Sequence, residues 1–160
     1  LMTLDITGLV PPPKIPTEFT LRTYDDVQDI NVLTEITNTG LADLPGHGVA
    51  SVESIKKILE TNPNDVTYLL FDADNKVIGS VGVTLRDTQG VVDSPAIVPE
   101  HRTPELYKTL VLLGLHDLTK RGCQQVQMYS WGDDDSTIAA YRELGFKTTV
   151  HEIGYRLDLP

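Results

Sequence analysis

The sequence predicts an α/β fold of the α+β kind, a mixed sheet of about six or seven strands with about four helices. Three observations lead to this prediction. Residues 91–146 follow the order strand, loop, helix, strand, turn, helix, so the first three elements form a central β-α-β crossover. Residues 66–71 and 77–85 have the pattern of an antiparallel hairpin. A length of 160 residues, 40 % of them hydrophobic, suits one domain with a packed core.

The chain begins with a proline-rich stretch. Four prolines between positions 11 and 16 favour an extended, semi-rigid conformation. We therefore expect a Pro-rich terminal segment or linker over residues 1–17 and one domain over residues 18–160. The apolar residues before the prolines have two interpretations, which are a strand from a neighbouring module and an ordered or frayed tail.

The first half of the predicted domain combines short strands with two amphipathic helices. Residues 19–23 alternate as a strand does, and apolar side chains recur at helical spacing over residues 27–36. A second helix should begin after the N-cap Ser51 and end before Pro63.

The helix that follows residue 103 is the most apolar one. Thr103 offers an N-cap hydroxyl and Pro104 suits the first helical position. The apolar stripe of this helix is too wide for a surface helix, so it should be central and largely buried. The strands that begin at Val91 and Gln124 flank it and should be parallel neighbours that splay apart at one end, since Pro95 cannot donate a ladder hydrogen bond. Residues 147–159 alternate as a last strand.

Composition excludes several classes of function. A formal net charge of −10 argues against a nucleic-acid surface. No apolar run approaches the roughly 18 residues of a membrane span, and no signal-peptide pattern opens the chain. The single cysteine, Cys123, suits a reducing compartment, so we expect a cytoplasmic protein. The histidines show no metal-ligand spacing, so we expect no metal.

Two motifs carry a resemblance to a known family. Val98, Pro99 and Arg102 precede the long helix, and Tyr141 precedes a Leu-Gly-Phe run at residues 144–146. With these spacings the chain resembles the GNAT acyltransferase superfamily, especially its mycothiol-synthase-like members. The resemblance implies a GNAT fold, acetyl-CoA as cofactor and transfer of an acetyl group to a small amine.

The resemblance also implies where the cofactor binds, because backbone amides at the start of the long helix bind pyrophosphate in the family. The residues that it assigns to the cofactor are Ile97, Val98, Arg102, Thr103, Tyr107, Lys108 and Asp134. The family's three loop glycines correspond here to Thr103, Glu105 and Tyr107, which do not allow the close backbone approach of glycine. Pro104 also lacks an N–H. We therefore expect acetyl-CoA binding to be weak or lost.

Two residues are candidates for catalysis. Tyr141 corresponds to the family tyrosine that protonates the departing thiolate; the alternative is a ring packed in the core with its hydroxyl satisfied elsewhere. Asp93 is a candidate base for the proton of the amine, and the alternative is a solvated acid at a strand end. His47, between two glycines, fits either a general base or an exposed loop histidine.

Two functions follow from these residues. The first is an acetyl-CoA-dependent N-acetyltransferase acting on a small amine. The second is a non-catalytic GNAT-fold domain with impaired CoA binding that serves as a partner-binding or stabilising module. The expected partners are accordingly a small-molecule amine or none, with a homodimer or a second GNAT domain as a further expectation, and neither a nucleic acid nor a membrane.

Overall fold

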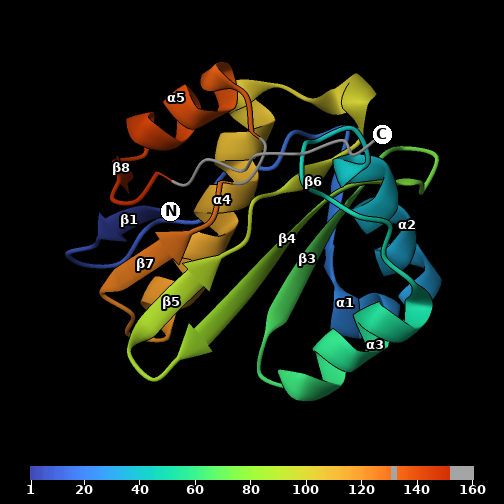
Figure 1. The fold of residues 1–160 in the computed structure, drawn as a ribbon, viewed down its shortest axis with the longest axis horizontal. Coiled ribbons are helices and arrows are strands. Elements are labelled where there is room, and N and C mark those ends of the chain that lie inside the picture. The colour runs from blue at the N-terminus through green and yellow to red at the C-terminus, as the bar shows by residue number, and fades with distance from the viewer. Residues whose placement is uncertain (131–132, 152–160) are drawn as a thin grey trace, which may run out of the picture.

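The computed structural model describes residues 1–130 and 133–151. Within these ranges, eight strands form one sheet in the order β2-β3-β4-β5-β7-β1-β8, with β6 paired to β4 (Figure 1). The strands are β1 (Met2–Asp5), β2 (Thr20–Thr23), β3 (Val66–Phe71), β4 (Val77–Arg86), β5 (Gln89–Val92), β6 (Ala96–Ile97), β7 (Gln125–Met128) and β8 (Lys147–Thr148). The helices are α1 (Tyr24–Val27), α2 (Ile30–Leu41), α3 (Val52–Thr61), α4 (Pro104–Lys120) and α5 (Asp135–Glu143), with a 3₁₀ turn at Pro99–His101. The predicted fold class is confirmed.

Helices cover both faces of the sheet. Gly114 of α4 lies so close to β5 that an added Cβ would be 2.8 Å from a methyl group of Val92. Gly40 of α2 lies equally close to Ala96 of β6. Because successive strand residues point to opposite faces, these contacts place α4 on one face and α2 on the other. As predicted, α4 is the central helix, with eight buried residues: Leu106, Tyr107, Leu110, Val111, Leu113, Gly114, Leu115 and Leu118.

The predicted crossover is confirmed. Strands β5 and β7 are parallel, with Gly90 opposite Val126 and Val91 opposite Gln127, and α4 connects them through the second layer. Beyond Val91 the described residues of the two strands no longer pair, because the chain leaves β5 and continues as β6 on β4.

A bulge causes this divergence. The sequence predicts one strand over residues 91–98, but the structure has two, β5 and β6, with a break at residues 93–95. Opposite this break, Val83 pairs with Val92 and Ser80 pairs with Ala96, so two residues of β4 face three residues of the other chain segment. One extra residue in one strand bends that strand away from its neighbour, and Pro95 lies within the break.

The N-terminal residues need a correction. We expect a terminal segment or linker over residues 1–17, but residues 2–5 form β1, which lies between β7 and β8 and is antiparallel to both. Met2 is buried in the core. The following residues cross α4. There the carbonyl oxygen of Val10 accepts a hydrogen bond from Nδ1 of His116 (2.7 Å), and the N–H of Val10 donates to the hydroxyl of Thr119 (3.1 Å). The prolines set the backbone conformation, but pairing with residues far along the chain decides where the strand lies.

The last predicted strand is described only in part. Residues 147–148 form β8, and residues 152–159 lie outside the described ranges. Among the described helices, none is long and apolar enough to cross a lipid bilayer.

The contact between α2 and β6 predicts a sharp effect of one methyl group. A Cβ on Gly40 would lie 2.9 Å from backbone atoms of Ala96 and Ile97, which cannot move without disturbing the sheet. We expect Gly40→Ala to lower the free energy of unfolding by roughly 1–2 kcal/mol, although alanine favours helix formation. Urea denaturation measures this change. Gly48→Ala is the control, since no atom lies within 4 Å of the added methyl group; equal effects of the two substitutions would contradict the proposed close packing.

Candidate functional site

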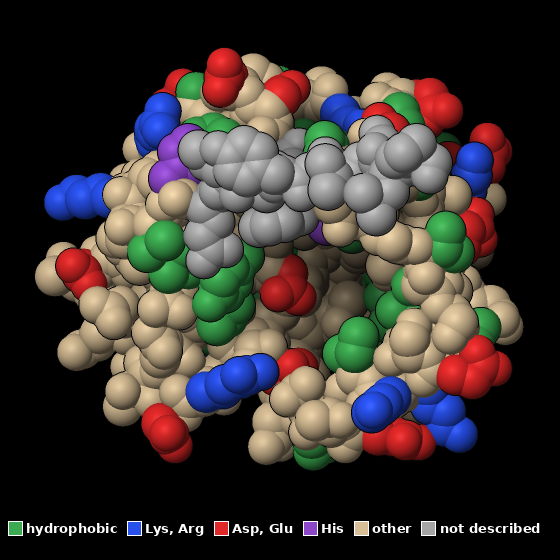
Figure 2. Space-filling model, in the orientation of Figure 1, with side chains coloured by type: hydrophobic (Ala, Val, Ile, Leu, Met, Phe, Trp, Pro, Cys, Tyr) green, Lys and Arg blue, Asp and Glu red, His purple; other side chains and the backbone are tan. Residues whose placement is uncertain are grey.

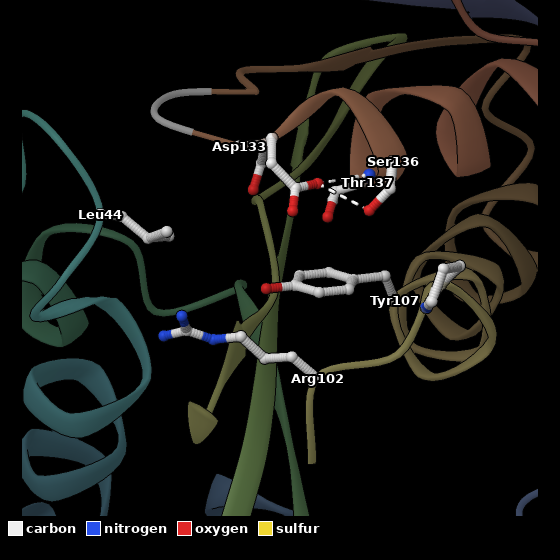
Figure 3. A pocket seen from close by; sticks show the side chains of 8 residues that line it. Leu44, Arg102, Tyr107, Asp133, Ser136 and Thr137 are labelled. Atoms are coloured by element: carbon white, nitrogen blue, oxygen red, sulfur yellow. Dashed lines mark hydrogen bonds between the residues drawn. The ribbon is translucent and has the colours of Figure 1, made fainter. Parts of the chain in front are cut away.

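An open recess lies between the α2–α3 loop and the starts of α4 and α5. Figure 2 shows a hollow in the middle of this face of the molecule, with acidic side chains beside it. Figure 3 shows the side chains that line the recess. Its lining residues come from the α2–α3 loop, the start of α4 and the start of α5: Leu44, Arg102, Pro104, Tyr107, Asp133, Asp134, Ser136 and Thr137.

The start of α4 is capped by its own residues. The hydroxyl of Thr103 accepts a hydrogen bond from the N–H of Leu106 (3.2 Å), and Pro104 occupies the first helical turn. Glu105 adds a negative charge to that turn, where the helix dipole favours it. This is the self-contained helix start that the sequence predicts, and it leaves fewer N–H groups for an external anion.

Arg102 holds three segments together. Its Nε donates to the carbonyl of Ile97 (2.9 Å) and one terminal nitrogen donates to the carbonyl of Gly40 (3.0 Å). Both terminal nitrogens also bind the carboxylate of Asp43, at 2.6 and 2.7 Å. These bonds raise the pKa of Arg102 and lower that of Asp43. The four hydrogen bonds engage most of the five N–H donors of the guanidinium.

Lys108 is also paired within the chain. Its Nζ lies 2.8 Å from a carboxylate oxygen of Glu143, which joins α4 to the end of α5. The pairing raises the pKa of Lys108. Both cations that the sequence assigns to cofactor phosphates therefore have internal carboxylate partners.

Tyr107 projects from α4 toward the recess. Its ring is buried and meets the ring of Tyr141 edge to face, with centroids 6.3 Å apart. Figure 3 shows its hydroxyl pointing into the space between Arg102 and Asp133. Burial raises the pKa of this hydroxyl, so it stays neutral at physiological pH. A side chain thus extends from the position where the family has its third glycine.

Tyr141 has features of both alternatives considered for it, a catalytic phenol and a ring packed in the core. Its ring is fully buried and meets Tyr107 of α4 edge to face, as a core residue would. Its hydroxyl lies 3.5 Å from Oγ of Ser94, in the break between β5 and β6. Burial, followed by the nearby Asp133, raises the pKa of Tyr141, so the phenol retains its proton.

Asp133 is a site residue that sequence reasoning missed. The run of three acids from Asp133 to Asp135 resembles a solvated turn, yet the Asp133 carboxylate accepts hydrogen bonds from Ser94 and Ser130, both at 2.9 Å. Its other oxygen is buried and has no hydrogen-bond partner among the described residues. Burial raises the pKa of Asp133, and the hydrogen bonds from Ser94 and Ser130, followed by the nearby His47, oppose that shift. Its position just after a crossover strand was the available signal, because such strand ends meet in a cleft.

Asp93 lies on the other side of the break. Its carboxylate covers Gly82, on the face that carries α2, whereas the neighbouring Ser94 contacts Tyr141. The side chain is open to solvent, but surrounding protein raises its pKa, and the nearby Asp65 adds to the shift. The break therefore directs one acid and one hydroxyl to opposite faces of the sheet.

The other predicted cofactor residues have structural roles. Ile97 and Val98 are buried, and the N–H of Val98 donates to the carbonyl of Ile78 (3.0 Å). Asp134 caps α5 by accepting a hydrogen bond from the N–H of Thr137 (2.8 Å), which lowers its pKa. No cluster of three or more potential metal ligands occurs in the described ranges.

Known proteins resemble this chain in sequence and fold, although no family model matches it. The mycothiol acetyltransferase of Saccharomonospora viridis is 26 % identical over 156 residues, which cover 91 % of this chain and 51 % of that protein. The mycothiol acetyltransferase of Tsukamurella paurometabola is also 26 % identical, over 94 % of this chain and 56 % of its own length. The chain thus spans about half the length of these curated relatives.

Two solved structures show the same fold. A GCN5-related N-acetyltransferase from Sphaerobacter thermophilus has a TM-score of 0.72 at 16 % identity, over 91 % of this chain and 46 % of its own. A predicted acetyltransferase from Clostridium acetobutylicum, solved with acetyl-CoA, has a TM-score of 0.69 at 14 % identity, over 86 % of this chain and 96 % of its own. The chain thus has the GNAT fold, and its sequence is similar to about half of each mycothiol acetyltransferase.

The GNAT fold implies acetyl-CoA, and the two ends of the site differ in how well they fit it. At the strand divergence, the hydroxyls of Ser94 and Tyr141 suit the thioester end. At the phosphate end, Pro104 offers no N–H, Tyr107 extends toward the recess, and the nearby cations are paired. The site therefore fits the phosphates only if Arg102 and Lys108 exchange their internal partners for them.

The raised pKa of Asp93 gives this domain a testable pH dependence. Because the folded pKa exceeds the unfolded value of about 3.9, the folded state binds more protons between the two values. The contribution of protonated Asp93 to the free energy of unfolding is fully present below about pH 3.9 and is lost as the pH rises through the folded pKa. We expect Asp93→Asn to gain thermal stability relative to the parent domain as the pH is raised from about 4 to 7.

Asp134→Asn is the matched control for this titration. The pKa of Asp134 is lowered, so its stabilisation is present above the unfolded pKa and is lost as the pH falls. This variant should therefore lose stability relative to the parent domain as the pH rises through the acid range that ends near the unfolded pKa of about 3.9. Melting temperatures of the three proteins from this acid range up to neutral pH measure both trends, and the same trend in both variants would contradict the assignment.

Proposed function

We propose that this domain is an acetyl-CoA-dependent N-acetyltransferase that acts on a small amine. The observation that carries the proposal is the position of the Tyr141 hydroxyl, 3.5 Å from Ser94 at the point where β5–β6 and β7 diverge. Acetyl-CoA, when bound, supplies an acetyl group activated as a thioester. A neutral phenol at this point can donate a proton to the sulfur that leaves when an amine attacks.

The acceptor side of the cleft favours a cation. Asp93 and Asp133 come from the two sides of the strand divergence, and the pKa of each is raised because its negative charge is poorly compensated. A protonated amine would supply the missing positive charge. Asp93 is then the candidate to accept a proton from the amine before attack, since a raised pKa lies closer to the operating pH and makes the carboxylate a better base.

The alternative is a non-catalytic GNAT-fold domain with impaired CoA binding. Two observations favour it: Tyr107 extends into the recess, and Tyr141 has no exposed surface. In this case the domain serves as a partner-binding or stabilising module, for which a second GNAT domain is the natural partner.

Calorimetric titration with CoA and a thiol-release assay with acetyl-CoA distinguish the two functions. The enzyme hypothesis predicts saturable CoA binding and amine-dependent thiol release with small primary amines, and none with tertiary amines of similar size. Absence of both binding and thiol release would favour the non-catalytic domain.

Substitution of the proposed acid tests its role directly. We expect Tyr141→Phe to lower kcat by on the order of 10²-fold because the proton donor is lost. The melting temperature should change little, since the contact of the hydroxyl with Ser94 is long, at 3.5 Å. Steady-state kinetics with the best amine measure kcat. Tyr129→Phe makes the same chemical change on an exposed tyrosine and should have no effect; an unchanged kcat in Tyr141→Phe would exclude this residue as the acid.

A further inference from the structure

Asp43 occupies the position that an external anion would take on Arg102. A carboxylate and a phosphate both bind the guanidinium fork through two oxygens, and Asp43 does so at 2.6 and 2.7 Å. Arg102 also lines the recess, so an anion that enters there reaches the same cation. We infer that Asp43 is an internal anion that competes with the cofactor phosphates for Arg102, and thereby links cofactor binding to the position of the α2–α3 loop. This inference rests on the proposed use of acetyl-CoA.

The two partners differ in how easily they can move. Arg102 remains tied to β6 and α2 through the carbonyls of Ile97 and Gly40, and its side chain is only 19 % exposed. Asp43 lies beyond the end of α2, and its side chain is 57 % exposed. An incoming phosphate would therefore displace Asp43 and leave the arginine in place.

The loop that contains Asp43 also carries residues of the cleft. Leu44 lines the recess next to Asp43, and His47 lies close enough to Asp133 to affect its pKa. Release of Asp43 would allow Leu44 and His47 to move on the side of the cleft where the amine is proposed to bind. Cofactor binding would then precede and prepare the acceptor site.

Glu143 has a similar relation to Lys108. The two charges lie 2.8 Å apart at the outer ends of α4 and α5. Lys108 does not line the recess, so Glu143 should affect the cofactor less than Asp43 does.

Titration of the whole domain with CoA tests the inference. We expect Asp43→Asn to bind CoA roughly tenfold more tightly, since a bidentate charged pair no longer has to be displaced. Pantetheine, which lacks the phosphates, should bind equally to the parent domain and the variant. Glu60→Gln is the matched control, because it removes one negative charge from the exposed Lys56–Glu60 pair of α3 and should leave CoA affinity unchanged.

Two further measurements separate competition from a general opening of the site. In an Arg102→Gln background, Asp43→Asn should no longer increase CoA affinity. Amide hydrogen exchange in residues 42–50 should accelerate when the parent domain binds CoA and should already be fast in Asp43→Asn. Asp43→Glu, which keeps the charge, should retain the weak affinity of the parent and shows whether a folding defect explains the result.

Several results would overturn the inference. These are unchanged or weaker CoA binding by Asp43→Asn, an equal gain for pantetheine, and no CoA binding by either protein. Failure of the proposed function would look different, because CoA affinity would respond to Asp43→Asn while no amine released thiol from acetyl-CoA.

Discussion

The break between β5 and β6 is the constraint on which the site depends. Two residues of β4 face three residues of the neighbouring segment, so the chain cannot continue as a regular strand beside β7. The same break turns Asp93 over Gly82 and brings Ser94 to Tyr141 and Asp133. A regular strand would alternate side chains but would remain paired to its neighbour, and the recess between the two strands would close. The cleft therefore results from a local departure from β geometry, held in place by the well-packed α4 on one face and α2 on the other.

Stability and ligand binding use the same groups in this domain. The Thr103 cap, the Pro104 turn and the Asp134 cap each stabilise a helix start at the edge of the recess, and each uses or removes a group that could otherwise contact a ligand. Arg102 and Lys108 likewise connect segments of the fold through carboxylate partners. A helix start that has glycines remains open to phosphate, whereas this one is already satisfied. Cofactor binding must then replace existing interactions, so its affinity reflects a difference between two sets of contacts.

Local patterns predicted much of the fold, and contacts between distant residues account for what they missed. Thr103 and Pro104 predicted the start of α4, Pro95 indicated the irregular strand, and the apolar stripe identified the central helix. These signals depend on neighbouring residues. The pairing of Met2 with Met128 and the link between Arg102 and Asp43 join residues that are far apart in the chain, where no pattern of spacing can show them. For the same reason, the sequence alone indicated a solvated acid at Asp133, because its hydrogen-bond donors Ser94 and Ser130 are placed next to it only by the fold.

Charge explains why the two substrates of the proposed reaction make opposite demands on this cleft. A formal charge of −10 and the acids beside the strand divergence attract a cationic amine and repel an anionic cofactor. The repulsion can be offset only by nearby cations, and the described residues of the recess provide one, Arg102. When Asp43 neutralises that guanidinium, the local field at the phosphate end becomes unfavourable for an anion. In the proposed reaction, the partner of a single arginine would thus decide whether the cofactor enters, and the acidic residues proposed to attract the amine would remain unchanged.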